Sequence, residues 1–424
     1  MDVVVKSIGE LIHDTRCAQN LTLTQLSELS GISKGTISKV ESGDVIRPEP
    51  QTIISLAGAL NIPFETMVDY YVQVETRSDQ LMRIFEASLA QGGSIEFIRK
   101  IASRYLDSTD GDSYELTEKL FQLISSIEDT FIQLSLYGFI IDYSRSHGIM
   151  PFIAKGLFQK YMIERYDFRR LKETYDSGKY ILNYVDFLPR DQQIELYYRL
   201  GIQAYNIRLY HESIEQCKRV PSEDNGTSPY RVHAVGVLRD SYFQLGQYRE
   251  AERYSFQYKQ FYYPDTNEQS ILMDALFNAV KGNTDKAIEQ LQTFLKTCSD
   301  AFILPAANNL MRLYLEKTNT EGIKILLENK KLSSISINVR NPFEYYKYGE
   351  YFHLIGEYFS IIGDFDNGIN HLLKGAMFFS KINDSCKEKE CLNKIMRIHI
   401  ENNIPIMGPT LEKLSAYFTN EMEG

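Results

Sequence analysis

The chain has 424 residues, of which 43% are hydrophobic and 24% charged, as in a globular protein with room for more than one domain. Its formal net charge of −10 excludes a protein whose whole surface binds polyanions, so any nucleic-acid site must be local. Five scattered cysteines without a CxxC pair favour reduced thiols, and no apolar run reaches the ~20 residues that span a bilayer. We therefore expect a cytoplasmic protein with no metal site, no cofactor and no membrane partner.

Residues 6–70 show the apolar spacing of five short helices. The run LTLTQLSELS contains three leucines at intervals of three, which predict one buried face: Leu23, Leu26 and Leu29. Thr22 is a predicted N-cap, because its hydroxyl can accept a hydrogen bond from an unpaired backbone N–H. Gly31 is predicted to end this helix in a left-handed conformation.

A second short helix is predicted in the run SKGTISKVESG, with Ser33 as its N-cap and with Ile37 and Val40 turned inward. Two short helices joined by a tight glycine turn predict a helix-turn-helix. The second helix must enter a major groove about 12 Å wide, so its outer face should carry small or flexible polar residues. The residues of this outer face are Ser33, Lys34, Gly35, Thr36, Ser38 and Lys39.

The pattern LTLTQLSELSGISKGTISKVESG…RP…TIISLAGALNI resembles the phage-repressor or Xre class of helix-turn-helix over about residues 6–70. The resemblance implies that Arg16 and Glu41 form a core ion pair and that Lys34, Gly35 and Lys39 read bases. It also implies that Ser33, Thr36 and Ser38 make flanking groove contacts and that Thr22 and Arg47 contact phosphates. Leu23 stands where the class usually has Gln, which puts one phosphate contact in doubt.

The charge of this N-terminal helix-turn-helix segment, called the head below, indicates that a single copy binds DNA weakly. Residues 1–62 contain five basic and seven acidic residues, although three of the five cations fall between Lys34 and Arg47. Because neutralisation of phosphates drives DNA binding, we expect a homodimer or a tetramer on a palindromic operator of double-stranded DNA. The alternative interpretation is a helical docking domain that never touches DNA.

From about residue 75 onward the helical spacing continues, and related units recur. The clearest unit, DSYFQLGQYREAERYSFQYKQFYYPD, has a turn glycine and a small residue that opens its second helix, and it resembles a tetratricopeptide repeat. Corresponding positions recur at 171, 213, 251, 287, 322 and 368. Two further helical pairs are predicted within 77–150, a longer loop at 221–229, and a terminal helix in TLEKLSAYFTN.

These patterns predict an all-α protein with two domains. The first is a lambda-repressor-like helix-turn-helix domain over residues 1–70, followed by a linker at 71–80. The second, within 71–424, is a right-handed superhelix of degenerate tetratricopeptide repeats whose concave face binds a peptide and which dimerises.

A head of this type joined to such repeats resembles the peptide-pheromone receptor regulators of Firmicutes, the RRNPP group, and is most like its NprR and PlcR types. The resemblance implies a quorum-sensing transcription regulator in which a short signalling peptide in the repeat groove controls DNA binding. Two alternatives stay open. One is a phage arbitrium-type receptor that controls lysis and lysogeny, and the other is a Rap-like inhibitor that sequesters a phosphorelay response regulator.

An extended peptide offers unpaired N–H and C=O groups, which suit Asn amides, and a carboxylate, which suits Arg. The candidate peptide-binding residues are Asn206, Arg231, Arg239, Asn278, Asn308, Asn309 and Arg312. We prefer Asn278, and each candidate has the alternative of being a solvated surface residue. The sequence contains no GxSxG, HExxH or glycine-rich phosphate loop, so we expect neither an enzyme nor a catalytic residue.

Overall fold

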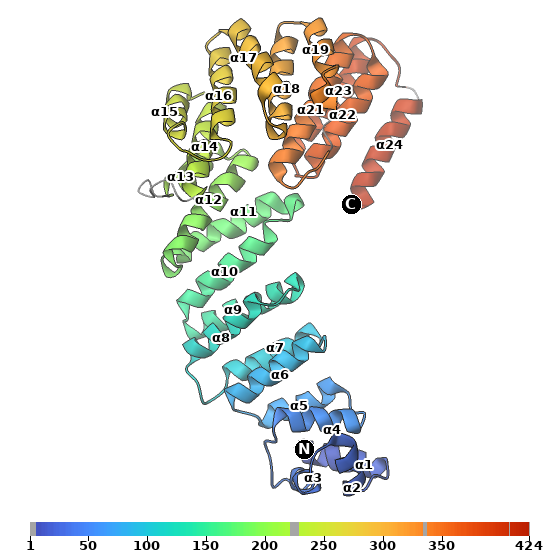
Figure 1. The fold of residues 1–424 in the computed structure, drawn as a ribbon. Coiled ribbons are helices and arrows are strands. Elements are labelled where there is room, and N and C mark those ends of the chain that lie inside the picture. The colour runs from blue at the N-terminus through green and yellow to red at the C-terminus, as the bar shows by residue number, and fades with distance from the viewer. Residues whose placement is uncertain (1–5, 221–228, 334–336, 407, 424) are drawn as a thin grey trace. The chain divides into compact units, whose positions relative to one another are not determined.

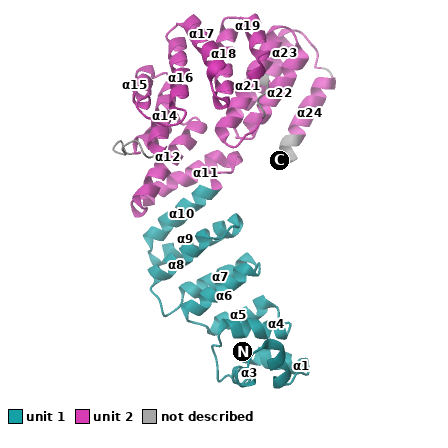
Figure 2. Cartoon of the chain, in the orientation of Figure 1, with its two compact units in different colours: residues 1–163 teal, residues 164–424 magenta. Residues whose placement is uncertain are grey.

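The computed structural model describes residues 6–220, 229–333, 337–406 and 408–423, and these residues form helices and no strand (Figure 1). The predicted all-α class is confirmed. The chain divides into two compact units, Met1–Ile163 and Glu164–Gly424 (Figure 2). Within the described ranges, every helix is too short or too polar to cross a bilayer.

Unit 1 begins with five short helices around one apolar core. They are α1 (Ile8–Ala18), α2 (Leu23–Ser30), α3 (Lys34–Glu41), α4 (Pro50–Ala59) and α5 (Phe64–Val74). Four of them each contribute a fully buried side chain to the centre of this core: Ile12, Leu26, Ile37 and Ile53. Each such side chain stabilises the fold by roughly 1.5–3 kcal/mol, so the apolar spacing of the sequence accounts for the position of the helices.

The prediction of a three-leucine buried face on α2 is wrong for Leu29, which is 62% exposed. Successive residues turn by about 100° around a helix, so Leu23 and Leu29 flank Leu26 on opposite sides, about 60° away from it. The neighbouring helices fully cover Leu26 and partly cover Leu23, and they leave Leu29 in solvent.

Two antiparallel pairs and one further helix complete unit 1. They are α6 (Ser78–Ala90), α7 (Ile95–Leu106), α8 (Ser113–Ser125), α9 (Thr130–His147) and α10 (Met150–Glu164). The two pairs predicted within 77–150 are thus present. One continuous apolar cluster runs from Ile8 to Phe152 and passes through the predicted linker at Tyr71 and Val72. The domain boundary at residue 70 stays a prediction, since the compact units divide at 163–164.

Unit 2 consists of helices that pack in sequential antiparallel pairs (Figure 1). The first are η1 (Phe168–Arg170), α11 (Leu171–Tyr180), η2 (Ile181–Phe187), α12 (Arg190–Asn206), α13 (Tyr210–Lys218), α14 (Pro229–Gln244), α15 (Tyr248–Tyr258) and α16 (Thr266–Val280). They are followed by α17 (Thr284–Thr297), α18 (Asp300–Glu316), α19 (Thr320–Leu327), α20 (Lys330–Ser333), α21 (Pro342–Ile361), α22 (Phe365–Ser380), α23 (Ser385–Glu401) and α24 (Gly408–Glu423). The predicted terminal helix is α24, and the predicted loop at 221–229 lies outside the described residues except for Pro229.

The pairs of unit 2 share one turn geometry although their sequences differ. Each turn has one residue with φ between 55° and 84°, namely Arg208, Gly246, Gly282, Thr318 and Gly363. In each turn the next N–H donates to the carbonyl five residues earlier, as Gln247 does to Tyr242 and Asn283 does to Asn278, both at 2.9 Å. This is the hydrogen bond of a Schellman motif, and it satisfies helix-end carbonyls without a fixed sequence.

The predicted small-residue positions lie where paired helices cross in unit 2. Ser213, Ala251 and Ala287 are fully buried, and Ser213 donates to the carbonyl of Gly201 on the partner helix at 2.8 Å. A side chain larger than these would separate the two helices, because protein interiors leave no spare volume. The periodicity read from the sequence therefore marks real helix contacts in this unit.

Candidate nucleic-acid interface

The turn between α2 and α3 is fixed by local caps. The Thr22 hydroxyl accepts from the backbone N–H of Gln25 at 3.2 Å, and the Gln25 side chain accepts from the N–H of Thr22 at 2.9 Å. Gly31 ends α2 with φ of 70°, and the Ser33 hydroxyl accepts from the N–H of Thr36 at 3.1 Å. These bonds satisfy orphan N–H groups at both helix starts, so the two helices are held in their relative orientation.

The outer face of α3 is available to a ligand, whereas its inner face is anchored. Ile37 and Val40 are buried, and the predicted reading residues on the other side are exposed except for half-buried Thr36. Neither Lys34 nor Lys39 forms an ion pair within the described part of the chain. Gly35 has open space around it, since a Cβ there would meet no atom within 4 Å.

The two predicted phosphate-contacting residues differ in their availability. Both Thr22 and Arg47 are exposed. The Thr22 hydroxyl already donates to Gln25 Oε1 at 2.9 Å in its capping role, so a phosphate contact there would have to replace an internal bond. The carbonyl of Arg47 accepts from Arg77 at 3.4 Å, and its own guanidinium forms no ion pair among the described residues.

Arg16 and Glu41 lie against each other, as the resemblance implied. Arg16 Nε and Nη2 donate to the two carboxylate oxygens of Glu41, each at 2.7 Å, and Nη1 donates to the carbonyl of Leu21 at 2.8 Å. Their side chains are only 13% and 7% exposed. The hydrogen bonds that Arg16 donates to Glu41 raise the pKa of Arg16 above its ordinary value. This bidentate pair ties α1 to the end of α3.

A second link between α1 and α3 is a close backbone approach. A Cβ on Gly9 would lie 2.3 Å from the carbonyl oxygen of Val40, a distance that no side chain can occupy. Gly9 is buried, and its helical backbone does not require glycine. Glycine is therefore required here because there is no space for a side chain, and its absence of a Cβ allows α1 and α3 to approach closely.

Residues 12–67 match the family model described as Helix-turn-helix. This segment is a helix-turn-helix domain. It covers all of α2, α3 and α4, and the turn, caps and anchoring pair described above belong to it.

Two curated relatives are similar over a short part of the chain. The uncharacterized HTH-type transcriptional regulator RghRB of Bacillus subtilis is 43% identical over 60 residues, which are 14% of this chain and 43% of the relative. The HTH-type transcriptional repressor RghR of the same organism is 41% identical over 64 residues, 15% of this chain and 47% of the relative. The chain thus spans less than half the length of these two relatives.

Two solved structures are similar over most of the chain at low sequence identity. The crystal structure of Bacillus thuringiensis PlcR in complex with the peptide PapR7 and DNA shares 14% identity, with a TM-score of 0.28, covering 92% of this chain and all of that one. The structure of phAimR shares 13% identity with a TM-score of 0.39, covering 94% and 100%. At these TM-scores neither likeness bears on function.

The helix-turn-helix domain joins the next helical pair through a buried carboxylate that the sequence reading missed. Glu75 is fully buried and accepts from Tyr71 Oη, from the N–H of Thr76 and from both the N–H and the guanidinium of Arg77, at 2.7–3.0 Å. Burial raises the pKa of Glu75, but these hydrogen bonds outweigh it and hold that pKa at about 2. Because Arg77 also reaches the carbonyl of Arg47, this joint links α6 to the loop after α3.

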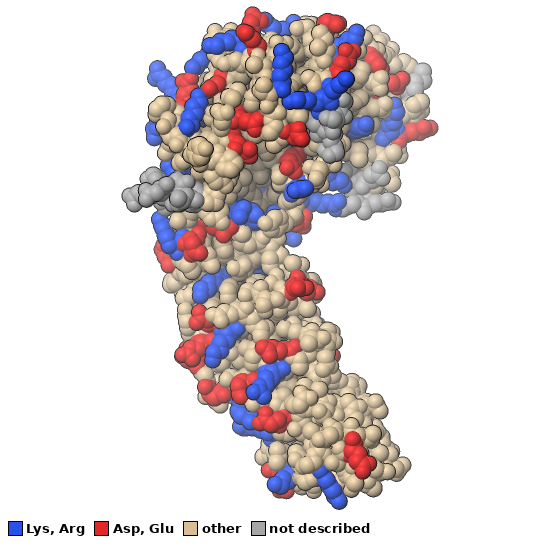
Figure 3. All heavy atoms as spheres, in the orientation of Figure 1, with Lys and Arg blue, Asp and Glu red and all other residues tan. Residues whose placement is uncertain are grey.

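No motif marks Glu75, since its partners come from tertiary packing. The sequence does contain a weak signal, namely an acidic residue directly after the largely apolar segment MVDYYVQV, with an arginine two positions later. The surface charges do not indicate a further binding site, because lysine and arginine are interspersed with aspartate and glutamate over the visible faces of both units (Figure 3).

All seven candidate peptide-binding residues belong to unit 2, and three of them are buried in its interior. Arg231 is 7% exposed and donates to the carbonyl of Val220 at 3.2 Å. Arg239 is 3% exposed, pairs with Asp240 at 2.7 Å and lies 4.7 Å from the ring centroid of Tyr258. Asn308 is 6% exposed and donates to the carbonyl of Lys347 at 2.9 Å. These internal contacts give all three a structural role.

The other four candidates reach the surface. Asn278 donates to the carbonyl of Asp274 and to Gln290, and Asn309 donates to the carbonyl of Pro305. Arg312 is exposed and donates to buried Glu350 at 2.5 Å. Asn206, at the end of α12, is half-buried, and its amide makes no hydrogen bond within the described ranges. All seven assignments stay predictions.

Proposed function

We propose that this chain is a transcription regulator that binds double-stranded DNA through its helix-turn-helix domain and is controlled by a short peptide held by unit 2. The observation that carries the DNA-binding part is the division of α3 into a buried apolar face and an exposed polar face with two unpaired lysines. An exposed polar face is common on surface helices, and the feature that favours DNA here is that the residues on this face between the two lysines are small: Gly35, Thr36 and Ser38. A helix that enters a major groove needs such a face, because lysine can donate to guanine or to phosphate and small hydroxyls can approach bases.

The proposed control by peptide rests on the stacked helical pairs of unit 2. Arrays of this kind present extended surfaces that hold strand-like ligands. Asn206 has an uncommitted amide, and Asn278 and Asn309 can exchange hydrogen bonds to backbone carbonyls of their own helices for bonds to a ligand. Arg312 is exposed, and its Nη1 bond to Asn309 can be exchanged while its Nη2 bond to buried Glu350 is kept. We propose that the protein works in the cytoplasm as a homodimer on a palindromic operator. The net acidic head supports this stoichiometry, because two weakly charged heads bind together more tightly than one.

The proposal is tested by selecting operator sequences with the full chain. Purified protein is used to enrich duplexes from a random library, and binding to the enriched sequence is measured by fluorescence anisotropy with and without an equimolar pool of short synthetic peptides. We expect enrichment of an inverted repeat and a change in affinity with part of the peptide pool. Failure to enrich any sequence contradicts DNA recognition, whereas enrichment without any peptide effect contradicts only the control by peptide.

A further inference from the structure

Arg77, the residue before α6, contacts the loop that carries one of the predicted phosphate-binding residues. This loop runs between α3 and α4 over residues 42–49 and contains Arg47. The carbonyl of Arg47 accepts from Arg77 Nη2 at 3.4 Å, and the carboxylate of Glu49 lies 3.6 Å from Arg77 Nη1. One guanidinium from outside the helix-turn-helix domain therefore contacts this loop at two positions.

The backbone of Arg47 is held, whereas its side chain is available. The first half of the loop is tied to α3, because the N–H of Val45 donates to the carbonyl of Lys39 at 3.0 Å. The second half is held by Arg77 through the carbonyl of Arg47. The guanidinium of Arg47 is exposed and forms no ion pair among the residues that the structure describes. A cation on a fixed backbone binds more tightly than one on a mobile loop, because less freedom is lost on binding.

Arg77 is itself fixed by the buried carboxylate of Glu75. Its Nε and Nη2 donate to the two carboxylate oxygens at 3.0 and 2.7 Å. The backbone of Glu75 is held from α7, where Arg104 Nε donates to the Glu75 carbonyl at 3.2 Å. These hydrogen bonds form a continuous connection from α7 through the end of α5 to the carbonyl of Arg47.

The α5 helix is joined to α7 at two further points. The N–H of Ser94, the residue before α7, donates to Glu65 near the start of α5 at 2.8 Å. Lys100 Nζ donates to Asp69, one turn further along α5, at 2.7 Å. Together with the bond from Arg104, these contacts follow α5 from its first turn to its end. The last helix of the head is therefore attached to α7 along its length.

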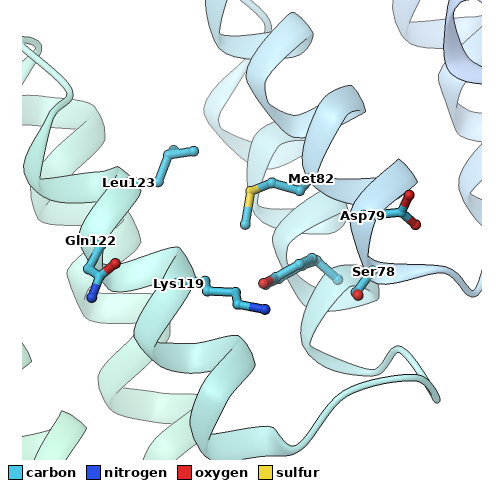
Figure 4. Close-up of a pocket in the computed structure, with 7 residues that line it drawn as sticks. Ser78, Asp79, Met82, Lys119, Gln122 and Leu123 are labelled. Carbon is cyan, nitrogen blue, oxygen red and sulfur yellow. The ribbon is translucent and has the colours of Figure 1, made fainter.

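The first turn of α6 is held by polar contacts. The N–H of Ser78 donates to both carboxylate oxygens of Asp110, at 3.0 and 3.1 Å. On the side of α8, Ser78 and Asp79 border an open pocket of about 490 Å³, into which Lys119 extends (Figure 4). Because α8 leaves this space open, the place of Arg77 depends on the hydrogen bonds to Glu75 and to Asp110.

From these contacts we propose that Arg77 is a positioning residue for DNA binding, which holds the loop after α3 so that the Arg47 side chain can contact a phosphate. The inference rests on the proposed DNA binding and adds a residue that lies outside the matched helix-turn-helix segment, 12–67. Arg77 acts through the backbone of Arg47 and does not itself contact DNA. The α6–α7 pair is then part of the DNA-binding apparatus.

The test is a double-mutant cycle in the full chain, with operator affinity measured by fluorescence anisotropy at several salt concentrations. We expect Arg47→Ala and Arg77→Met each to weaken binding about fivefold or more and to reduce the salt dependence by about one unit of slope. Because both changes remove the same phosphate contact, the double variant is expected to bind within about twofold of the weaker single variant. A purely structural role of Arg77 would lower stability without this coupling to Arg47.

Two further measurements control for effects on folding and on net charge. Arg77→Met leaves buried Glu75 without its cation, so the cycle is repeated in the Glu75→Gln background, where no buried charge is stranded. Circular dichroism establishes that each variant keeps its helical content. Arg83→Met removes an exposed arginine of α6 that forms no ion pair in the described ranges, and it is expected to bind the operator like the original chain.

The inference is overturned if Arg77→Met binds the operator as well as Arg83→Met does in both backgrounds. It is also overturned if the losses from Arg47→Ala and Arg77→Met multiply, because Arg77 would then contribute a contact of its own. Both outcomes leave the proposed DNA binding standing. Failure of the original chain to bind any duplex overturns the proposed function together with this inference.

Discussion

The guanidinium of Arg16 and the carboxylate of Glu41 meet in two parallel hydrogen bonds of 2.7 Å, which join the first helix of the helix-turn-helix domain to the end of α3. Replacing Arg16 with Ala leaves the Glu41 carboxylate in a site where it is only 7% exposed. Loss of one member of a buried pair typically costs about 3–5 kcal/mol. We therefore expect Arg16→Ala to destabilise residues 8–60 by about 3 kcal/mol.

This is measured in the full chain by amide hydrogen exchange, because the head shares its apolar core with α6–α9. The double replacement Arg16→Met with Glu41→Leu serves as the control. It removes both charges together and should cost less than Arg16→Ala alone. Unchanged protection of the core amides in Arg16→Ala would show that the pair does not hold α3 in place.

Gly9 and Gly35 provide a matched pair of glycine replacements. In Gly9→Ala the new Cβ meets the carbonyl of Val40, so α1 and α3 must separate, and we expect a loss of about 1–3 kcal/mol from overpacking. In Gly35→Ala the new Cβ meets nothing, and alanine favours a helix over glycine by about 1 kcal/mol. Thermal unfolding followed by circular dichroism distinguishes them, and equal melting temperatures would contradict the close crossing.

The joint at Glu75 predicts a dependence of stability on pH. The pKa of Glu75 is about 2 in the folded chain, below its ordinary value of 4.5. Ionised Glu75 therefore contributes its full stabilisation above about pH 4.5, and this contribution is lost as the pH falls toward 2. We expect Glu75→Gln to lower the stability of unit 1 by about 1–3 kcal/mol at pH 7. The difference in the free energy of unfolding between Glu75→Gln and the original chain should narrow steadily between pH 4.5 and pH 3.

The measurement is urea unfolding of both proteins at several pH values, with the exposed residue Glu49 changed to Gln as the control. Glu49 lies 3.6 Å from the same arginine but at the surface, so its replacement should have little effect at any pH. A constant difference between Glu75→Gln and the original chain from pH 7 to pH 3 would contradict the assigned pKa.

The candidate peptide-binding residues should separate into two classes. Arg239→Ala removes a buried cation that pairs with Asp240 and lies over Tyr258, so it should lower the melting temperature whether or not peptide is present. Asn206→Ala removes a half-buried amide without an internal partner, so stability should be unchanged and only peptide affinity should fall, by about 1 kcal/mol. A normal peptide affinity in Asn206→Ala would remove this residue from the site.

The parts of the fold that depend on local chemistry could be predicted from the sequence. The caps at Thr22 and Ser33 and the left-handed Gly31 follow from the hydrogen bonds that nearby residues can make. The small positions at Ser213 and Ala251 follow from helix periodicity. In both cases the interacting groups lie close in sequence or repeat at regular intervals, so the pattern contains the information.

The parts that depend on distant contacts could not be predicted in this way. Leu29 has the right spacing for the core but lies beyond the strip of α2 that other helices cover. The role of Gly9 requires the carbonyl of Val40, 31 positions away, and the burial of Arg239 requires the packing of unit 2. The pairing of Arg16 with Glu41 came from the family resemblance, because nothing in the spacing of two residues 25 apart requires it.

The central claim, that α3 reads DNA, is tested most directly by measuring the affinity of Lys34→Ala with Lys39→Ala for the selected operator at several salt concentrations. Lys286→Ala with Lys324→Ala, which removes two exposed lysines of unit 2, is the control. We predict that the α3 variant keeps its helical content, loses at least 100-fold in affinity and shows a salt dependence reduced by about two units of slope. Operator affinity equal to that of the control variant would contradict the claim.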